Sequence, residues 1–194
     1  SEYAKSNNRF AFVVRFFADV LTGLPSIIVG IVSYVIIVIS IGSFSVIAGA
    51  FSLSLIMIPL VARITEESLK MVPDPIREAA HSLGVPKWKI TIFIVLKTAT
   101  SGVLTGIVLS IARIAGETAP LIMTILGTSL YFSSFTGPVD ALPLRIWRLA
   151  SLPYESAHAS GWGAAMILIL LILGLSVGLR VLARKQNIAT SKDT

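Results

Sequence analysis

An arginine and a glutamate inside a long apolar stretch are the residues best placed to act on a ligand. Arg113 and Glu117 are four positions apart in Ala112-Arg-Ile-Ala-Gly-Glu-Thr-Ala-Pro120, a spacing that places both on one face of a helix. Charged residues at membrane depth are costly and usually face a cavity or a partner charge. A guanidinium group presents a planar fork of donors that fits phosphate oxygens. The pair predicts an anion path lined by Arg113, with Glu117 orienting or partly neutralising it, or a structural salt bridge.

The composition indicates an integral membrane protein. Of 194 residues, 55% are hydrophobic and 13% are charged, and the mean hydropathy is +0.86. A soluble domain has about twice that charged fraction. The net charge of +6 does not indicate nucleic acid, because the basic residues gather at the ends of apolar runs, as the positive-inside rule expects. The expected non-protein partner is therefore membrane lipid. The absence of cysteine excludes disulfides and thiolate metal sites.

The apolar runs predict one all-α transmembrane domain over residues 1–194. The four expected spans cover about 24–40, 45–62, 92–125 and 160–182. The third, if it were a single helix, would be about 50 Å long, whereas the hydrocarbon core is roughly 30 Å thick. We therefore expect it to begin in the cytoplasmic layer, to tilt, or to kink at Gly116 and Pro120.

The distribution of charge predicts the orientation of the chain. Residues 63–91 hold five basic side chains, which places this loop in the cytoplasm. Residues 127–158 are rich in turn formers and are expected outside, with a short helix at 142–150. Within that loop, Arg145 and Arg148 are interpreted as solvated charges or as contacts for an incoming anion or its binding protein. Four spans would leave both ends of the chain in the cytoplasm.

The segment before the first span has two interpretations. In residues 1–22, apolar positions fall near one helical face, and Arg15 and Asp19 are expected to form an i,i+4 pair on another. The segment is either a helix at the cytoplasmic surface or a plain juxtamembrane linker. Because the chain opens in polar sequence at Ser1, without Met, we expect a fragment whose earlier spans are missing.

A polar, basic stretch at 78–97 is predicted to form a bent pair of helices between two spans. Asp74 is expected to cap the first helix, with Pro75 in its first turn, and Gly84 to end it in a left-handed conformation. Pro86 then starts a second helix that continues into apolar sequence. An exposed helix pair of this kind is a surface for a partner, or an ordinary amphipathic loop.

The same stretch resembles the EAA loop of ABC importer permeases. The matching residues are Glu78, Ala79, Ala80, Gly84, Ile94 and Leu96. Lys97 stands where that family usually has proline, so the start of the following span is the part that departs from the pattern. The resemblance implies that an ATP-binding subunit is contacted by five residues: Glu78, Ala79, Ala80, Leu83 and Gly84.

A second resemblance points to the PstA family of phosphate-specific permease subunits. It rests on the stretch from Arg113 to Pro120, on Phe17–Gly30 and on Leu142–Trp147. It implies the type I importer (MetI-like) fold, a bacterial inner-membrane location, and transport of inorganic phosphate along a path with Arg113 and Glu117. It also implies three kinds of protein partner: a second permease subunit, a dimer of ATP-binding subunits and an extracytoplasmic phosphate-binding protein.

Other functions stay open at this point. An importer permease for molybdate, sulfate or an amino acid would share the EAA loop, and an ATP-independent anion transporter or channel could use the Arg113–Glu117 pair alone. An enzyme is not expected, because no nucleophile–base constellation lies at membrane depth. The chain has no nucleotide-binding Gly-x-x-x-x-Gly-Lys-Ser/Thr loop, and its two histidines, His81 and His158, are far apart. We therefore expect no cofactor or metal, and ATP hydrolysis would reside in a partner.

Overall fold

The computed structural model describes residues 9–129, 132 and 134–190. This part of the chain is built from helices, with a single isolated bridge between Leu126 and Val139. In chain order the elements are α1 (Arg9–Gly23), α2 (Ser26–Ser33), the π-helix η1 (Tyr34–Val38), α3 (Ile39–Ile41), α4 (Val46–Lys70), α5 (Asp74–Ser82), α6 (Lys87–Lys89), the π-helix η2 (Ile90–Val95), α7 (Leu96–Ala115), α8 (Ala119–Thr124), α9 (Leu142–Ala150) and α10 (Glu155–Thr190). The prediction of an all-α protein is confirmed.

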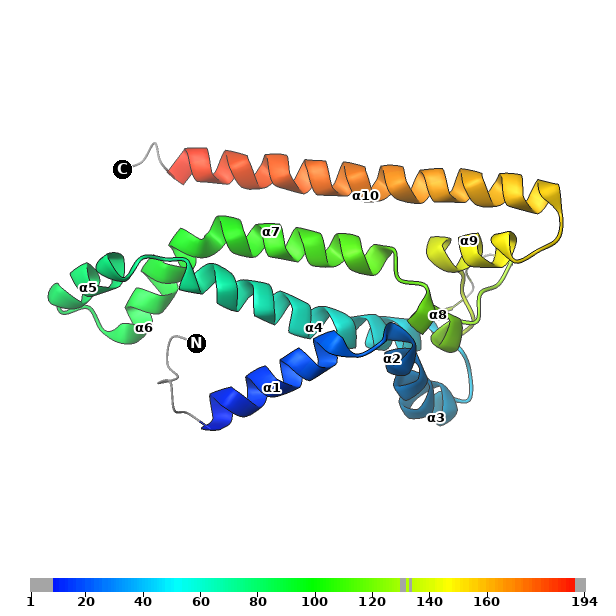
Figure 1. Ribbon diagram of the computed structural model, residues 1–194, viewed down its shortest axis with the longest axis horizontal. Helices are drawn as coiled ribbons and strands as arrows, with labels where there is room; N and C mark the ends of the chain where they lie inside the picture. Colours follow the sequence, from blue (N-terminus) through cyan, green and yellow to red (C-terminus); the bar gives the residue numbers. More distant parts are fainter. Residues whose placement is uncertain (1–8, 130–131, 133, 191–194) are drawn as a thin grey trace.

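The long helices run side by side and the short ones gather at their two ends (Figure 1). Helix α7 packs between α4 and α10. Helices α5 and α6 lie at one end of this layer, and α8 and α9 lie at the other. The start of α1 and the end of α10 point toward the α5–α6 end. The start of α1 and the end of α10 therefore lie on the same side of the molecule as the loop that the sequence places in the cytoplasm.

In the part of the chain that the structure describes, three continuous helical segments are long and apolar enough to cross a membrane: Val46–Lys70, Lys87–Ala115 and Glu155–Leu179. A fourth crossing is counted only if α1 and the segment Ser26–Ile41, which are bent by 104° relative to each other, act as one span. Ser26–Ile41 alone is about 24 Å long and is shorter than the roughly 30 Å hydrocarbon core. The expected span at 24–40 therefore corresponds to one arm of a bent pair.

The third expected span also differs from the prediction. Helix α7 ends at Ala115, Gly116 follows as its C-cap, and α8 carries Pro120 in its first turn. The break falls where Gly116 and Pro120 were expected to kink the helix, and α8 lies off the axis of α7 (Figure 1). The physical reason is that proline lacks the N–H that a continuing helix needs and is favoured at a helix start.

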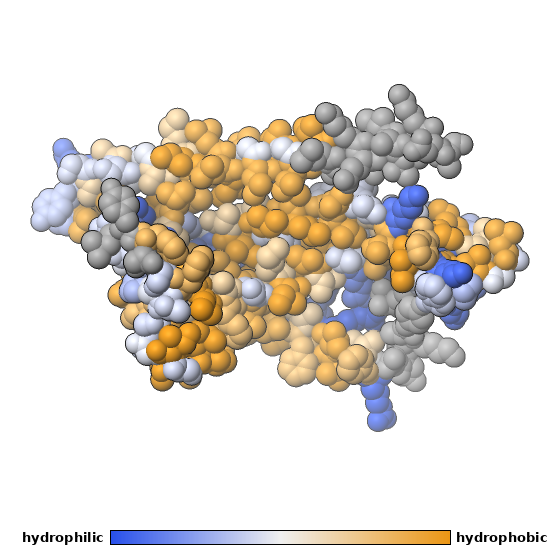
Figure 2. Space-filling view, turned by 180° about the vertical axis from the view of Figure 1, so that it is seen from behind, coloured by the Kyte–Doolittle hydropathy of each residue, from blue (hydrophilic) through white to orange (hydrophobic). Residues whose placement is uncertain are grey.

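The outer surface of the long helices is apolar, as a lipid-facing surface requires. In the space-filling view, hydrophobic residues cover the middle of the molecule, and hydrophilic residues gather toward its ends (Figure 2). None of the apolar window of α10 is buried inside the chain. In water this much exposed apolar area would cause aggregation. In a bilayer the same apolar surface contacts the lipid chains.

Small residues let the helices approach closely. Gly102 and Gly106 on α7 face Ser68 and Ile64 on α4, and a Cβ built at Gly102 would lie 2.8 Å from the Ser68 hydroxyl oxygen. A Cβ at Gly30 on α2 would lie 2.8 Å from the Cα of Pro120 on α8. Membrane helices associate through such contacts, because no hydrophobic effect drives them together in lipid.

Candidate functional site

The corner between α5 and α6 is closed by backbone hydrogen bonds. Gly84 has a φ of +74°. Its N–H donates to the carbonyl of His81 at 2.9 Å, and the N–H of Val85 donates to the carbonyl of Ala80 at 3.3 Å. These two bonds form the Schellman motif, which ends a helix and favours glycine at the left-handed position. The prediction that Gly84 ends the first helix is confirmed.

The start of α5 differs by one position from the prediction. Pro73 occupies the cap position and Asp74 is the first helical residue, so the prediction that Asp74 caps the helix is wrong. Its carboxylate still lies in the first turn, where negative charge suits the helix dipole, and it is 3.7 Å from the Nε of Arg77. Arg77 also donates from Nη2 to the carbonyl of Leu69 at 2.7 Å. This bond ties α5 to the end of α4.

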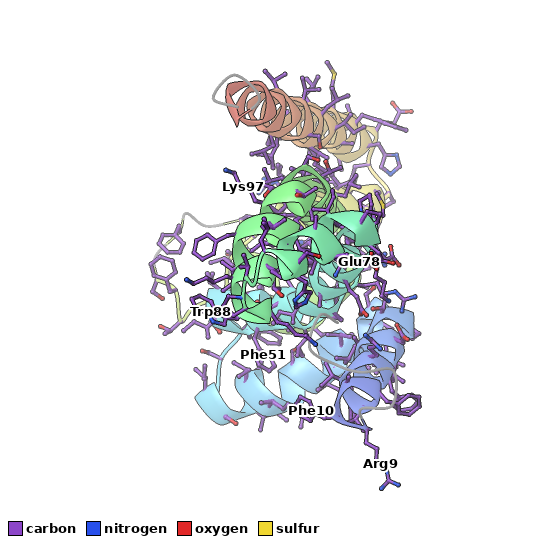
Figure 3. All side chains as sticks on the ribbon, turned by 90° about the vertical axis from the view of Figure 1, so that its left-hand side faces the viewer. Arg9, Phe10, Phe51, Glu78, Trp88 and Lys97 are labelled. Atoms are coloured by element: carbon purple, nitrogen blue, oxygen red, sulfur yellow. The ribbon has the colours of Figure 1, made fainter. Side chains whose placement is uncertain are left out.

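The predicted coupling residues do not all face outward. Glu78, Ala79 and Gly84 are exposed, and Leu83 is 82% exposed. Ala80 is 5% exposed and packs in a cluster with Val72, Ile90, Val95 and Ala99. Viewed from this end of the molecule, Glu78 and Trp88 both reach the surface that faces the reader (Figure 3). Ala80 therefore anchors the corner, and the other four residues form its exposed face.

The corner is joined to the long helix without a break. Pro86 caps α6, and the helical segment then continues through η2 into α7, from Lys87 to Ala115. Its length is about 43 Å, which leaves its first turns outside a hydrocarbon core of about 30 Å. Lys97 has the backbone N–H that proline lacks, and the helix passes through it unbroken. The π-helix η2, which the sequence did not predict, packs against α5.

Arg113 and Glu117 lie at the far end of the same helix. Arg113 is in the last turn of α7, while Glu117 lies beyond its end, so the expectation that both lie on one face of a helix is wrong. Turn hydrogen bonds from Gly116 to Arg113 and from Glu117 to Ile114 keep the two side chains on one side. The Nε of Arg113 is 3.8 Å from the Oε1 of Glu117. The side chains are 55% and 18% exposed, respectively.

The two charged side chains line a cavity of about 340 Å³. The cavity is also lined by residues 21–26, which comprise the end of α1, its link to α2 and the first residue of α2. Ile56 and Leu60 of α4 complete the lining. The sequence pointed to Arg113 and Glu117 but not to this link. The signal that was available is Gly23-Leu24-Pro25, where glycine and proline end one helix and start the next.

The corner and the cavity are thus carried by the two ends of one helix, and the sequence around both is shared with known proteins. Residues 3–188 match the family of binding-protein-dependent transport system inner membrane components. The chain belongs to this family. With its long apolar helices, it is a multi-pass inner-membrane protein.

Individual members of the family show the similarity in more detail. The phosphate transport system permease protein PstA of Yersinia pestis is 42% identical over 96% of this chain and 63% of its own length. PstA of Xylella fastidiosa (strain 9a5c) is 41% identical over 97% of this chain and 66% of its own length. PstA of Mycobacterium leprae is 40% identical over 87% and 56%. The chain therefore spans less than two thirds of the length of these relatives.

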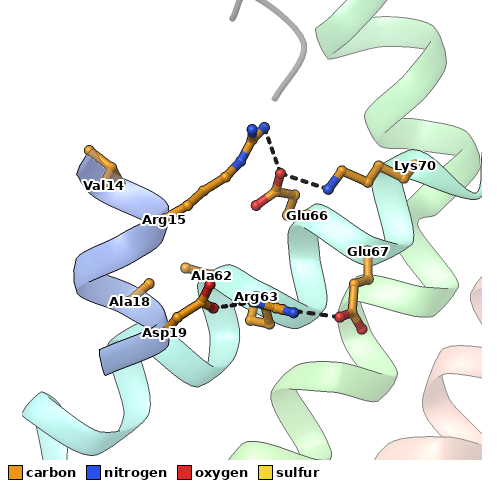
Figure 4. A pocket seen from close by; sticks show the side chains of 9 residues that line it. All are labelled: Val14, Arg15, Ala18, Asp19, Ala62, Arg63, Glu66, Glu67 and Lys70. Carbon is orange, nitrogen blue, oxygen red and sulfur yellow. Dashed lines mark hydrogen bonds and ion pairs between the residues drawn. The ribbon is translucent and has the colours of Figure 1, made fainter. Parts of the chain in front are cut away.

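An ionic cluster joins α1 to α4 in this family member (Figure 4). Arg15 on α1 is 2.7 Å from Glu66, which is also 3.0 Å from Lys70. Arg63 pairs with Asp19 on α1 and, at 3.2 Å, with Glu67. The members of this ionic cluster are Arg15, Asp19, Arg63, Glu66, Glu67 and Lys70. It holds α1 against the end of α4 that leads to α5.

The ionic cluster corrects an expectation for the first helix. Arg15 and Asp19 were expected to pair with each other, but the ion pairs cross to α4. The Glu66 side chain, which receives one of these pairs, is only 20% exposed. The i,i+4 spacings of Arg63 with Glu67 and of Glu66 with Lys70 were visible in the sequence. The approach of α1 was not, because it depends on a contact between distant segments.

At the opposite end of the molecule, the two arginines of the outer segment share one carboxylate. Helix α9 covers Leu142–Ala150, as predicted. Arg145 is 3.2 Å and Arg148 is 3.9 Å from the two carboxylate oxygens of Asp140. A pocket of about 300 Å³ lies beside them. Because one acid partly neutralises both arginines, this surface is less basic than the sequence suggested.

Proposed function

We propose that this chain is the main part of a permease subunit of an ATP-driven importer of inorganic phosphate. The relatives named above are called phosphate transport system permease proteins, and they match almost the whole chain. Sequence similarity of this extent supports a shared substrate class, and the charged cavity supplies a chemical reason for it. The chain itself would catalyse no reaction.

The cavity lined by Arg113 is the observation that carries the proposal. The Arg113 side chain lines the cavity and is 55% exposed overall. Its guanidinium group therefore retains donors for an oxyanion, and its fork geometry suits phosphate. In the proposal Arg113 contacts the ion, and Glu117 keeps it from binding too tightly to leave. A purely structural salt bridge would instead be expected to have a short, hydrogen-bonded geometry.

The proposed coupling uses the continuity of the helix between the corner and the cavity. ATP-driven closure of the nucleotide-binding subunits would pull the exposed face of the α5–α6 corner, at Glu78, Ala79, Leu83 and Gly84. Because α6, η2 and α7 form one helical segment, the pull would rotate the Arg113 face between inward-open and outward-open positions. The helix is then a two-state element that both ATP and the ion can bias.

The proposed complex has four kinds of component. Besides this chain it contains a second permease subunit, a dimer of ATP-binding subunits at the α5–α6 corner and an extracytoplasmic phosphate-binding protein at the α8–α9 end. Lipid surrounds the apolar face of α10. In this arrangement residues 63–91 and both ends of the chain are cytoplasmic, and no nucleic acid takes part.

Transport assays with the full-length permease, assembled with its partner subunits in proteoliposomes, test the proposal. Labelled phosphate uptake should require ATP and the binding protein, and arsenate should compete while sulfate and molybdate do not. ATP-dependent uptake of another anion, without uptake of phosphate, would reject phosphate as the substrate and leave the proposed coupling intact. Phosphate uptake without ATP would reject the coupling.

A further inference from the structure

The carboxylate of Glu117 faces the same cavity as Arg113, although a cavity for anions gains nothing from a negative charge alone. The two are the charged residues of the cavity lining among the described parts of the chain. The rest of the wall is apolar except for the hydroxyls of Thr22 and Ser26. Thr22 already donates its hydroxyl hydrogen to the carbonyl of Ala18 at 2.7 Å. The charged pair therefore dominates recognition at this site.

The distance within the pair leaves both partners with unused hydrogen-bonding capacity. The Nε of Arg113 and the Oε1 of Glu117 are 3.8 Å apart, whereas an N–H···O hydrogen bond spans about 2.7–3.2 Å. Arg113 can donate to an incoming oxygen atom, since a guanidinium group has donors and no acceptor. Glu117 can accept a hydrogen bond, since an ionised carboxylate has acceptors and no donor.

From this arrangement we infer that Glu117 is a specificity-determining residue that admits oxyanions carrying a proton and rejects those that carry none. The inference rests on the proposed function and deepens it. The P–O–H group of phosphate donates to Glu117 while an unprotonated oxygen of the same ion accepts from Arg113. Sulfate and molybdate carry no proton at neutral pH, so one of their oxygens would meet the carboxylate lone pairs with no hydrogen between them.

The size of the expected discrimination follows from the strength of such contacts. Hydrogen bonds to a charged group contribute about 1.5–3 kcal/mol, which is roughly tenfold to a hundredfold in affinity. A site built to accept a hydrogen bond from its ligand also disfavours analogues that lack the donor. We therefore expect phosphate and arsenate to bind at least about tenfold more tightly than sulfate.

The experiment must leave out the proposed binding protein, so that the cavity alone selects the anion. The chain contains no cysteine, so Ile56→Cys places a single reactive thiol in this chain at the cavity wall. The full complex with this substitution is reconstituted without binding protein, and thiol labelling is measured with phosphate, arsenate or sulfate added. The same complex without the new cysteine provides the blank.

The inference predicts a pattern across three forms of residue 117. With Glu117, phosphate and arsenate slow the labelling and sulfate does not. In Glu117→Gln the amide can donate, so sulfate should protect within about threefold of phosphate. In Glu117→Asp the carboxylate remains and should still exclude sulfate, which separates selectivity from a general loss of packing.

Two results would overturn the inference, and they differ in meaning. If sulfate protects as well as phosphate in the Glu117 form, or stays excluded in Glu117→Gln while phosphate still protects, Glu117 is not the filter and the proposed path stands. If no anion protects in any form, the cavity is not the ion path, and both the proposed substrate path and the inference fail.

Discussion

The α5–α6 corner and the Arg113 cavity lie at opposite ends of one helical segment and are built in different ways. The corner is local: hydrogen bonds between neighbours in sequence close it at Gly84, and Ala80 anchors it in a buried cluster. The cavity is assembled from distant segments, and its charged pair is 3.8 Å apart and partly exposed. A rigid corner can transmit a force. A charged pair without a close hydrogen bond can rearrange around an ion.

The largest expected effect is at the cavity. Arg113→Gln removes the cationic fork and should abolish phosphate uptake, because neutral donors make weaker bonds to an anion. The complex should still copurify with its partners, since the side chain is more than half exposed. Uptake by the reconstituted complex is measured beside Arg9→Gln, a control at the exposed start of α1. Unchanged uptake in Arg113→Gln would reduce the pair to a structural salt bridge.

A second large effect is expected at the corner. Gly84→Val places a β-branched residue at a φ of +74°, a conformation that costs about 1–3 kcal/mol for residues other than glycine. We expect insertion to persist while uptake per ATP hydrolysed falls by about tenfold. Gly84→Asn is the matched control, because asparagine tolerates the left-handed region and should keep most of the coupling. Normal coupled uptake in Gly84→Val would show that this conformation is not needed.

A moderate effect is expected where α2 supports the cavity wall. A Cβ at Gly30 would lie 2.8 Å from the Cα of Pro120, and backbone cannot move aside as a flexible side chain can. Gly30→Val should therefore lower the stability of the complex by about 1–3 kcal/mol, seen as a lower thermal unfolding midpoint. Gly163→Val on α10, where nothing lies within 4 Å, should leave the midpoint unchanged. Equal midpoints for both variants would contradict the close α2–α8 packing.

The smallest effect is expected in the ionic cluster, whose Arg63 and Asp19 side chains are about half exposed. Asp19→Arg should destabilise the complex by no more than about 1 kcal/mol, because water and salt screen exposed pairs. Combining it with Arg63→Asp restores opposite charges and should recover part of the loss in low salt. If the double variant is no better than Asp19→Arg alone, the α1–α4 pair does not contribute.

The same contrast explains what could be read from the sequence. Gly84, Pro86 and the helix at 142–150 were predicted correctly, because turn and capping signals act over a few residues. The limits of the long helices were less accurate, and α4 extends to Lys70 where the expected span ended at 62. Residues 63–70 are mostly polar, so they continue the helix beyond the apolar run that marked the expected span.

The parts that were missed depend on distant segments meeting. The contribution of Leu21–Ser26 to the cavity and the pairing of Arg15 with Glu66 require α1 to fold beside α4. No local pattern in either segment encodes that approach. Arg113 and Glu117 were identifiable because a charged residue in an apolar run is costly and therefore informative. The other residues that line the cavity are uncharged and gave no such signal.

The most direct test of the account is whether the corner controls the cavity. Thiol labelling of Ile56→Cys, from the inside or the outside of proteoliposomes, reports which side the cavity faces. With Gly84 present, trapping the complex with ATP should move labelling from the inner to the outer reagent. In Gly84→Val, labelling should stay on the inner side despite ATP. An identical ATP response in both forms would contradict a link between the corner and the cavity through α7.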